Sequence, residues 1–337
     1  MNEPRVAIVI LNWNGWEDTI ECLESIYQID YSNYRIVLVD NNSSNGSLLK
    51  IKDYCSGKIK VKSNFLEYNG NNKPIQIKEY SKEESESKTN KKDLTSNQLV
   101  LITNDRNYGF AEGNNIGIRY SLQTLNADYV LLLNNDTIVD KNFLGEMVDL
   151  GVTDENIGII GPKIYYYDDP DTIWCIGGKI DWKLARGLHV GTNEVDIDQY
   201  NKTEEFDYVS GSAFLIKQEV LDKVGLMDNK FFLYFEESDL ALRASKKGYK
   251  SVYAPEAKIW HKVSKSGGGL SKPIGLYYIT RNRWLFMKKW AKKSDYTFFA
   301  LYQAVGAFVF PIILSVYYKN WKLIGAYYSG LWNGLIG

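Results

Sequence analysis

The stretch Leu131-Leu132-Leu133-Asn134-Asn135-Asp136-Thr137 decides the fold class of this chain. An aliphatic run stops there at two amides and a carboxylate. Short apolar runs bounded by polar residues are typical of strands buried in a parallel sheet. Ligands of open α/β sheets bind at the carboxyl ends of such strands. We therefore expect Asp136 at a crevice, where a carboxylate beside amide oxygens suits a hard divalent cation with phosphate bound to it.

Three more apolar runs end in the same way. The runs 6–11, 35–39 and 99–102 stop at Asn12, Asp40 and the polar segment 104–107. Segments with helical spacing lie between the runs, at 17–28, 113–125 and 143–150. This alternation predicts an α/β fold with a Rossmann-like, mostly parallel central sheet flanked by helices. From Pro273 onward the chain reads as helices, which predicts a helical C-terminal extension.

Composition excludes some classes of protein. The 337 residues carry a formal net charge of -1, and no basic tract argues for a nucleic-acid partner. The cysteines Cys22, Cys55 and Cys175 show no metal-binding spacing and no disulfide framework, which fits a reducing cytosol. The first residues lack the pattern of a signal peptide. We therefore expect the active part of the protein to face the cytoplasm.

Two segments depart from the regular pattern. Residues 56–98 include a charged, Ser-rich tract poor in apolar residues, which predicts an inserted surface loop. Residues 298–318 contain no charged side chain and are rich in tyrosine and phenylalanine. This length suits a membrane span, an interfacial or re-entrant helix, or a buried core helix, and the sequence leaves all three open.

Three motifs carry a family resemblance. Residues 6–14, 39–44 and 107–115, which read Val-Ala-Ile-Val-Ile-Leu-Asn-Trp-Asn, Val-Asp-Asn-Asn-Ser-Ser and Asn-Tyr-Gly-Phe-Ala-Glu-Gly-Asn-Asn, resemble the family 2 glycosyltransferases, and within them the rhamnosyltransferase-like group. The resemblance covers roughly residues 5–290. It implies a GT-A fold with a catalytic domain over 1–270, interrupted by the charged surface insertion 56–98. From their apolar composition we expect residues 271–337 to form a helical, partly apolar segment that associates with a membrane.

The resemblance implies a nucleotide diphosphate sugar, a UDP- or dTDP-sugar, as donor. Asp40 matches the family acid that binds the uracil or ribose, and a carboxylate can accept two hydrogen bonds from either. A helix-capping acid is the alternative for Asp40. The remaining donor-binding candidates lie in the matching motifs and strand ends: Asn12, Asn14, Asn42, Asn107, Gly109, Asn114 and Asn134.

The same resemblance implies a divalent cation, Mn²⁺ or Mg²⁺. The family motif has two acids separated by one residue, and here it reads Asn134-Asn135-Asp136, with an amide in the first place. Asp136 is then the main anionic ligand, and His261 resembles the distal histidine of several members. The cation would stabilise the diphosphate leaving group. A helix cap for Asp136 and a structural role for His261 are the alternatives.

An acidic pair precedes a helix at Glu236 and Glu237, where the family usually has Glu-Asp and uses the second acid as general base. Glu237 occupies that place, and Glu236 competes with it because the longer side chain shifts the carboxylate. A base takes the proton of an acceptor hydroxyl as it attacks the anomeric carbon, and one displacement inverts that carbon. Solvated acids at a helix start are the alternative.

Arg281 and Arg283 resemble the Arg-Asn-Arg of this subgroup and are candidates to hold the diphosphate of the donor or of a lipid-linked acceptor. The expected acceptor is a glycan or a polyprenyl-diphosphate-linked sugar, at the inner face of the cell membrane. Two other functions stay open on the sequence alone. One is a non-catalytic nucleotide-sugar-binding module, and the other is a nucleotidyltransferase.

Overall fold

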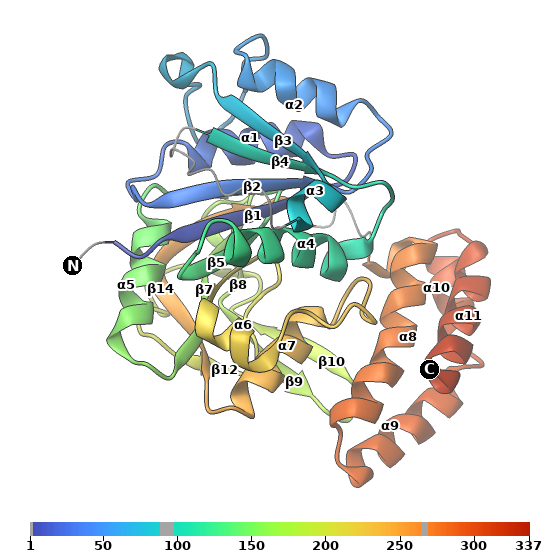
Figure 1. The fold of residues 1–337 in the computed structure, drawn as a ribbon. Coiled ribbons are helices and arrows are strands. Elements are labelled where there is room, and N and C mark those ends of the chain that lie inside the picture. The colour runs from blue at the N-terminus through green and yellow to red at the C-terminus, as the bar shows by residue number, and fades with distance from the viewer. Residues whose placement is uncertain (1–2, 88–97, 264–268) are drawn as a thin grey trace.

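The first half of the chain forms the predicted parallel strands. The computed structural model describes residues 3–87, 98–263 and 269–337. Strand β1 (Val6–Asn12) lies between β2 (Tyr34–Asp40) and β5 (Tyr129–Asn134), and β4 (Gln98–Thr103) pairs with β2. All these pairings are parallel. The carboxyl ends of these four strands therefore lie side by side, as the sequence predicts (Figure 1).

Helices cover both faces of this sheet. The strands are buried on both sides, and alternate residues of β1 point into two separate apolar clusters. One cluster includes α1 (Trp16–Ile26), α2 (Ser47–Cys55) and α5 (Phe143–Thr153). The other includes α4 (Gly109–Gln123), α6 (Gln218–Val224) and α7 (Glu236–Ser245). The observed layers are those expected of a parallel sheet, whose crossover helices lie on its faces.

The second half extends the sheet with mixed direction. Strand β13 (Ala213–Lys217) runs antiparallel between β5 and β7 (Ile157–Tyr166), and β14 (Lys250–His261) pairs parallel with β7 and antiparallel with β6 (Thr137–Val139). Strand β7 is continuous through its glycines at 158 and 161, and β14 is a single strand with a bulge between Ala254 and Lys258. The remaining strands are short: β8 (Thr172–Cys175), β9 (Gly177–Asp181), β10 (Arg186–Val190), β11 (Glu194–Val195) and β12 (Glu205–Phe206).

The charged tract 56–98 holds more structure than a loop. A short 3-10 turn, η1 (Gly70–Asn72), precedes strand β3 (Gln76–Ser81), which pairs with β4 and forms the edge of the sheet. Helix α3 (Lys82–Glu86) follows β3 directly. Ser81 and Glu84 form a reciprocal capping box that starts α3. The loop prediction is therefore wrong for residues 76–86. Residues 88–97 of the tract lie outside the described residues.

The predicted C-terminal helices are confirmed. A 3-10 turn, η2 (Gly269–Ser271), leads into α8 (Pro273–Trp290), α9 (Lys293–Gly306), α10 (Phe310–Tyr317) and α11 (Lys322–Ile336). These helices stand together at one side of the sheet layers, with α8 nearest to them (Figure 1). In the described part of the chain no single helix has the length and apolarity to cross a bilayer. Only α9 with α10, bent by 57°, meets those criteria as a pair.

Candidate active site

The strand ends bring the first group of candidate residues together. In the sheet register Asn12 lies opposite Asp40, and Leu11 lies opposite Asn134. Asp40 is buried and accepts hydrogen bonds from Asn12 Nδ2 (2.6 Å) and from the backbone N (2.9 Å) and Oγ (2.6 Å) of Ser43. Asn12 Oδ1 in turn accepts from Thr19 Oγ1 at 3.0 Å. The carboxylate of Asp40 is thus held in one orientation by its neighbours.

Asn14 shapes the loop beside Asp40. Its backbone is left-handed (φ 57°), and its Oδ1 accepts from the backbone N of Ser44 at 2.8 Å. Its own backbone N donates to Ser43 Oγ at 2.8 Å. The loops after β1 and β2 are therefore joined to each other, as two loops that share one ligand should be.

Asn41 links β2 to the loop before α4, although the sequence reasoning singled out Asn42. Asn41 is buried, and its Nδ2 donates to Asn107 Oδ1 (2.9 Å) and to the Gly109 carbonyl (3.0 Å). Its Oδ1 accepts from Asn104 Nδ2 at 3.0 Å. Asn42 is exposed and has a left-handed backbone (φ 62°), which turns its neighbour inward.

Gly109 starts α4 at a position that only glycine fits. Its φ is 79°, and a Cβ there would lie 2.5 Å from Phe232 Cδ2. The backbone N of Phe110 donates to the Phe232 carbonyl at 2.7 Å. Asn114, one turn later, donates to the Phe110 carbonyl at 2.9 Å and so bonds within its own helix. The bond between Phe110 and Phe232 joins the start of α4 to the segment that precedes the acidic pair.

Asp136 and His261 form the candidate metal pair. Antiparallel pairing of β6 and β14 places them together, with Asp136 Oδ1 3.1 Å from His261 Nε2. Both side chains are buried, yet Asp136 Oδ1 and His261 Nδ1 have no hydrogen-bond partner among the described residues. Asn134 ends β5 close by in sequence, and Asn135 Nδ2 donates to Thr19 Oγ1 at 2.9 Å.

These two residues fit a cation only in part. The described residues hold no cluster of three or more histidine, cysteine, aspartate or glutamate side chains suited to a metal. Hard divalent cations take six or more oxygen ligands, so a cation here would need most of its ligands from elsewhere. Oxygens of a bound diphosphate are the ligands that fit this shortage.

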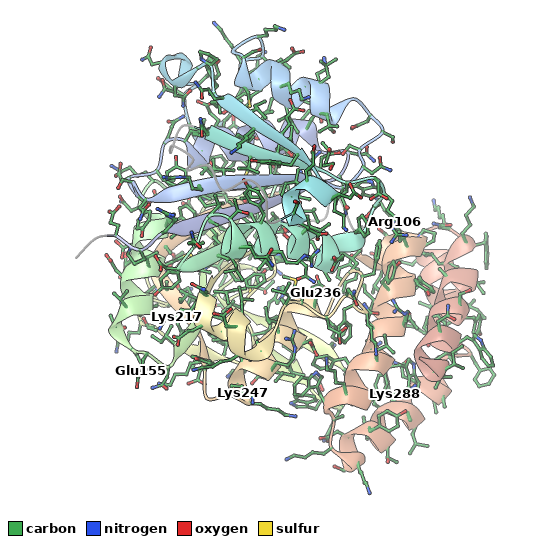
Figure 2. The ribbon with its side chains drawn as sticks, in the orientation of Figure 1. Arg106, Glu155, Lys217, Glu236, Lys247 and Lys288 are labelled. Carbon is green, nitrogen blue, oxygen red and sulfur yellow. The ribbon has the colours of Figure 1, made fainter. Side chains whose placement is uncertain are left out.

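Glu236 and Glu237 begin α7 in different surroundings. Glu236 is buried in the interior of the molecule (Figure 2), and its Oε2 has no hydrogen-bond partner in the described part of the chain. Burial, and then the neighbouring Glu237, raise the pKa of Glu236 well above its usual range. Glu237 is half-buried, and burial raises its pKa as well. A carboxylate with a raised pKa is a stronger base, which suits proton abstraction.

Glu237 faces a cavity of about 460 Å³ between the sheet domain and the C-terminal helices. The walls combine apolar and cationic side chains from α8, α9, α10 and β10. The polar and ionisable residues that line it include Glu237, Ser238, His189, Tyr208, Arg186 and Arg283. This cavity holds a base, hydroxyl groups and positive charge, and it is our candidate for the site of chemistry.

The two arginines of the Arg-Asn-Arg motif point to different places. Arg283 lines the cavity, and its guanidinium donates to the carbonyls of Ala185 (3.2 Å) and Leu184. It forms no ion pair within residues 3–87, 98–263 and 269–337. Arg281 donates to the Lys230 carbonyl at 2.8 Å and does not line this cavity. Arg283 is therefore the better placed of the two to meet an anionic group beside Glu237.

His189 belongs to β10, lines the cavity and lies near the candidate metal pair. The ring of Trp174 makes edge contacts with both His189 (4.8 Å) and His261 (4.9 Å). No local sequence signal revealed this arrangement, since it depends on the β9–β10 hairpin folding back.

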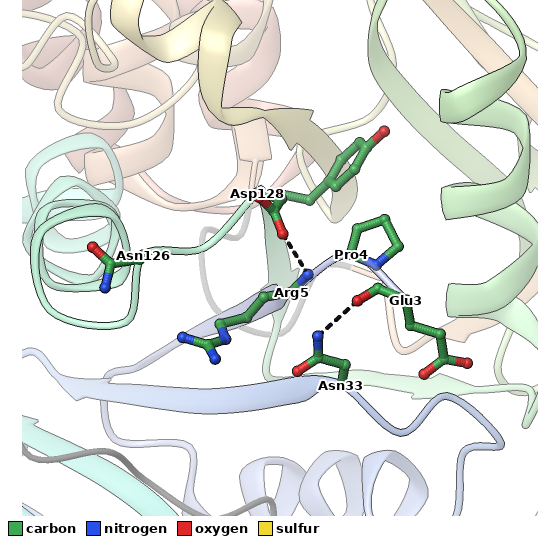
Figure 3. Close-up of a pocket in the computed structure, with 7 residues that line it drawn as sticks. Glu3, Pro4, Arg5, Asn33, Asn126 and Asp128 are labelled. Carbon is green, nitrogen blue, oxygen red and sulfur yellow. Dashed lines mark hydrogen bonds between the residues drawn. The ribbon is translucent and has the colours of Figure 1, made fainter. Parts of the chain in front are cut away.

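A second hollow lies at the opposite end of the strands. Figure 3 shows its lining, which includes Arg5, Asn33 and Asp128. The backbone N of Arg5 donates to Asp128 Oδ2 at 2.7 Å, and Asn33 Nδ2 donates to the Glu3 carbonyl at 2.7 Å. It sits at the amino ends of β1 and β2, away from the predicted edge, and contains none of the candidate residues.

Family comparisons agree with this geometry. A family described as "Glycosyltransferase like family 2" matches residues 89–286, more than half of the chain, and one described as "Glycosyl transferase family 2" matches residues 7–72. The chain belongs to the family 2 glycosyltransferases. This glycosyltransferase is thus an enzyme, and the alternatives of a non-catalytic module and a nucleotidyltransferase are set aside.

Individual relatives are distant but consistent. The glycosyltransferase is 24% identical over 289 residues to the low-salt glycan biosynthesis hexosyltransferase Agl10 of Haloferax volcanii, covering 86% of this chain and 77% of that one. It is 26% identical over 153 residues to an N-acetylglucosaminyl-diphospho-decaprenol L-rhamnosyltransferase of Mycobacterium tuberculosis, covering 42% of this chain and 49% of that one. These relatives support the rhamnosyltransferase-like assignment.

A solved structure confirms the GT-A fold. The mannosyltransferase PcManGT from Pyrobaculum calidifontis, in complex with GDP-Man and Mn²⁺, matches this glycosyltransferase with a TM-score of 0.56 and 14% identity. The match covers 100% of this chain and 87% of that one. At that identity the likeness concerns the fold alone.

Proposed function

We propose that this glycosyltransferase is an inverting enzyme that moves a sugar from a nucleotide diphosphate sugar to an acceptor hydroxyl, with Glu237 as general base. One observation carries the proposal: Glu237 faces the cavity and has a raised pKa. Glu236 is the competing base. Its burial and its unpartnered oxygen favour a supporting role, because a group must reach the acceptor proton to remove it.

The donor would lie along the strand ends. Asp40, oriented by Asn12 and Ser43, already accepts three hydrogen bonds and keeps about one lone-pair site, on Oδ2, to accept from the pyrimidine base or a sugar hydroxyl of a UDP- or dTDP-sugar. Asn14, Asn107 and Gly109 hold the loops around it. Asn42 is exposed and Asn114 bonds within its helix, so they are the weakest members of the proposed donor set.

Asp136 and His261 would hold Mn²⁺ or Mg²⁺ together with the donor diphosphate, and Asn134 could add a neutral oxygen. Two observations support this assignment. Asp136 Oδ1 and His261 Nε2 lie 3.1 Å apart, and His261 Nδ1 is buried with no hydrogen-bond partner among the described residues. When bound, the cation supplies Lewis-acid stabilisation of the leaving diphosphate. Affinity for metal without nucleotide would be weak, since the protein offers few ligands.

The reaction would proceed in one displacement. Glu237 takes the proton from the acceptor hydroxyl, and the oxygen forms a bond to the anomeric carbon. The bond from that carbon to the diphosphate breaks on the opposite face, which inverts the configuration. Arg283, in the same cavity, is placed to meet a phosphate of the donor or of the acceptor.

The acceptor would be a glycan or a polyprenyl-diphosphate-linked sugar at a membrane. The apolar wall of the cavity includes Leu276, Ile279 and Phe310, and it continues into the helices α9 and α10. Those helices and the turn between them expose apolar side chains that each have more than half of their area accessible: Leu301, Val305, Phe308, Val309, Ile313 and Val316. Such a patch marks an interaction surface, and its position favours a lipid surface beside the cavity.

This arrangement favours two functional parts, a catalytic domain over 1–270 and a membrane-associating part over 271–337. The enzyme would then work at the inner face of the cell membrane. Sedimentation with vesicles of anionic phospholipid tests this, with a variant carrying Val305→Ser and Phe308→Ser as comparison. Equal binding of both proteins would count against the assigned surface.

The core test is transfer from a panel of UDP- and dTDP-sugars, with and without Mn²⁺ or Mg²⁺. We expect metal-dependent transfer with inversion, and loss of transfer in Asp136→Ala. Retention of anomeric configuration, or full activity without metal, would overturn the mechanism.

A further inference from the structure

The turn before the acidic pair has an unfavourable backbone. Tyr234 and Phe235 both adopt left-handed conformations, with φ values of 71° and 76°, directly before Glu236. Bulky residues seldom adopt this region, and they stay there only when surrounding contacts hold them. The position of Glu236 and Glu237 therefore depends on whatever holds this turn.

Asn282 of α8 makes the hydrogen bonds that hold it. Asn282 is fully buried, and its Nδ2 donates to the carbonyls of Leu233 (2.8 Å) and Tyr234 (3.0 Å). Its Oδ1 has no hydrogen-bond partner among the described residues. A buried amide oxygen without a partner lowers the stability of the fold. The two hydrogen bonds that Asn282 donates to the turn offset that cost.

Other residues of α8, which recur at helical spacing, contact the same segment. Each contacts a different point of residues 228–239. Tyr278 stacks on Phe232 at 4.8 Å, Arg281 donates to the Lys230 carbonyl, Phe286 packs on Phe235 at 5.1 Å, and Lys289 pairs with Asp228 (2.9 Å) and Asp239 (2.7 Å). One face of α8 thus contacts the segment that leads into α7 and carries the acids (Figure 1).

We propose that Asn282 is a positioning residue for the transfer reaction. It holds the left-handed turn at Tyr234 and Phe235, and so fixes the carboxylate of Glu237 against the cavity. The inference rests on the proposed function, because it assumes that Glu237 acts in catalysis. Loss of the two hydrogen bonds should displace the base and slow the chemical step, while the strand ends that hold the donor keep their contacts.

The first test is the pair Asn282→Ala and Asn282→Leu, the second of which keeps the volume of the side chain. We expect kcat to fall by roughly ten- to hundredfold, as a displacement of about 1 Å can cost. The donor dissociation constant, measured by calorimetry, should change less than about twofold. Asn333→Ala is the matched control, since it removes one hydrogen bond to α8, from Asn333 Nδ2 to the Tyr277 hydroxyl (3.0 Å), and should leave kcat unchanged.

The second test separates positioning from general loss of packing. Phe235→Gly and Phe235→Ala are each combined with Asn282→Ala. Both remove the ring, but only glycine adopts the left-handed conformation freely. We expect the glycine combination to have a kcat several-fold higher than the alanine combination.

Three results overturn the inference: wild-type kcat in both Asn282 variants, a fall in donor affinity as large as the fall in kcat, or equal kcat in the two Phe235 combinations. Absence of transfer by the wild-type protein, with every donor, refutes the proposed function instead and removes the role of Asn282 with it. The wild-type assay therefore distinguishes the two failures.

Discussion

The donor side and the acid side of the proposed active site differ in how their buried polar groups are hydrogen-bonded. On the donor side, Asp40 and Asn41 are buried, and hydrogen bonds from neighbouring loops reach both of their side chains. On the acid side, Glu236 is buried, its Oε2 has no hydrogen-bond partner within residues 3–87, 98–263 and 269–337, and two left-handed residues precede it. Side chains whose polar atoms are hydrogen-bonded, as those of Asp40 and Asn41 are, keep their orientation without a ligand, although Asn104 Oδ1 beside them has no partner among the described residues. An unpartnered carboxylate after a strained turn is held in place by the rest of the fold. The first arrangement suits binding, and the second suits reactivity.

Replacing the proposed base should have the largest effect. Glu237→Gln keeps the size of the side chain but removes the proton acceptor, so we expect the transfer rate to fall by roughly 10²–10⁴-fold. Steady-state assays with saturating donor and acceptor measure it. The same change at Glu236 should cost much less, and a larger loss there would reverse the assignment of the two acids.

Removing the charge on the donor side should mainly affect binding. Asp40→Asn turns an acceptor of three hydrogen bonds into a group that faces the donors of Asn12 and Ser43, and we expect donor affinity to fall by roughly tenfold or more. Calorimetric titration with the donor measures this change. Asp53→Asn is the control because its carboxylate lies outside the site and pairs with Lys58. Unchanged donor affinity in Asp40→Asn would remove Asp40 from the donor site.

A change at the junction should weaken both sides moderately. Gly109→Ala places a Cβ against Phe232 in a left-handed backbone, and strain of this kind costs about 1–3 kcal/mol. We expect a lower melting temperature together with a loss of both donor affinity and kcat. Gly145→Ala is the control, since a Cβ there meets nothing within 4 Å. If kcat alone changed, the junction would not support the donor side.

The smallest effect concerns stability and its dependence on pH. Burial raises the pKa of Glu236, so the folded protein keeps a proton that the unfolded chain releases above its ordinary pKa of about 4.3. The free energy of unfolding therefore falls as pH rises from the ordinary pKa of a glutamate toward the raised pKa of Glu236 in the folded protein. Glu236→Gln does not titrate and avoids that loss.

Thermal melts of Glu236→Gln and wild type at pH 5 and pH 8 test this expectation. The advantage of the variant should be larger at pH 8, by roughly 2–4 °C for each kcal/mol recovered. Glu83→Gln, at an exposed position, should show the same small difference at both values. An advantage that does not depend on pH would mean that Glu236 does not titrate abnormally.

The strand ends could be predicted from sequence because their signal is local. An apolar run followed by Asn12, Asp40 or Asn134 marks both the strand and the edge at which ligands bind. Which of Asn41 and Asn42 turns inward depends on the left-handed backbone of Asn42, and the motif does not reveal it.

Local sequence patterns do not predict contacts between segments that lie far apart in the chain. The bonds from Asn282 to the turn before Glu236 join α8 to a segment about fifty residues earlier, and the place of His189 depends on a hairpin. The helix α3 is a different case, because Ser81 and Glu84 have the spacing of a capping box, and the high charge of the tract concealed that signal.

Strand β3 has a consequence for how the sheet meets other protein molecules. It covers β4, whose residues Leu99 to Ile102 are completely buried, and it places Lys78 and Glu79 at the outermost position of the sheet. Charged edge strands discourage pairing with a second chain. Deleting residues 73–87 to shorten the charged tract would leave β4 as an apolar, unpaired edge. We expect the shortened protein to associate through its sheets, which would mean that the tract protects the enzyme from aggregation.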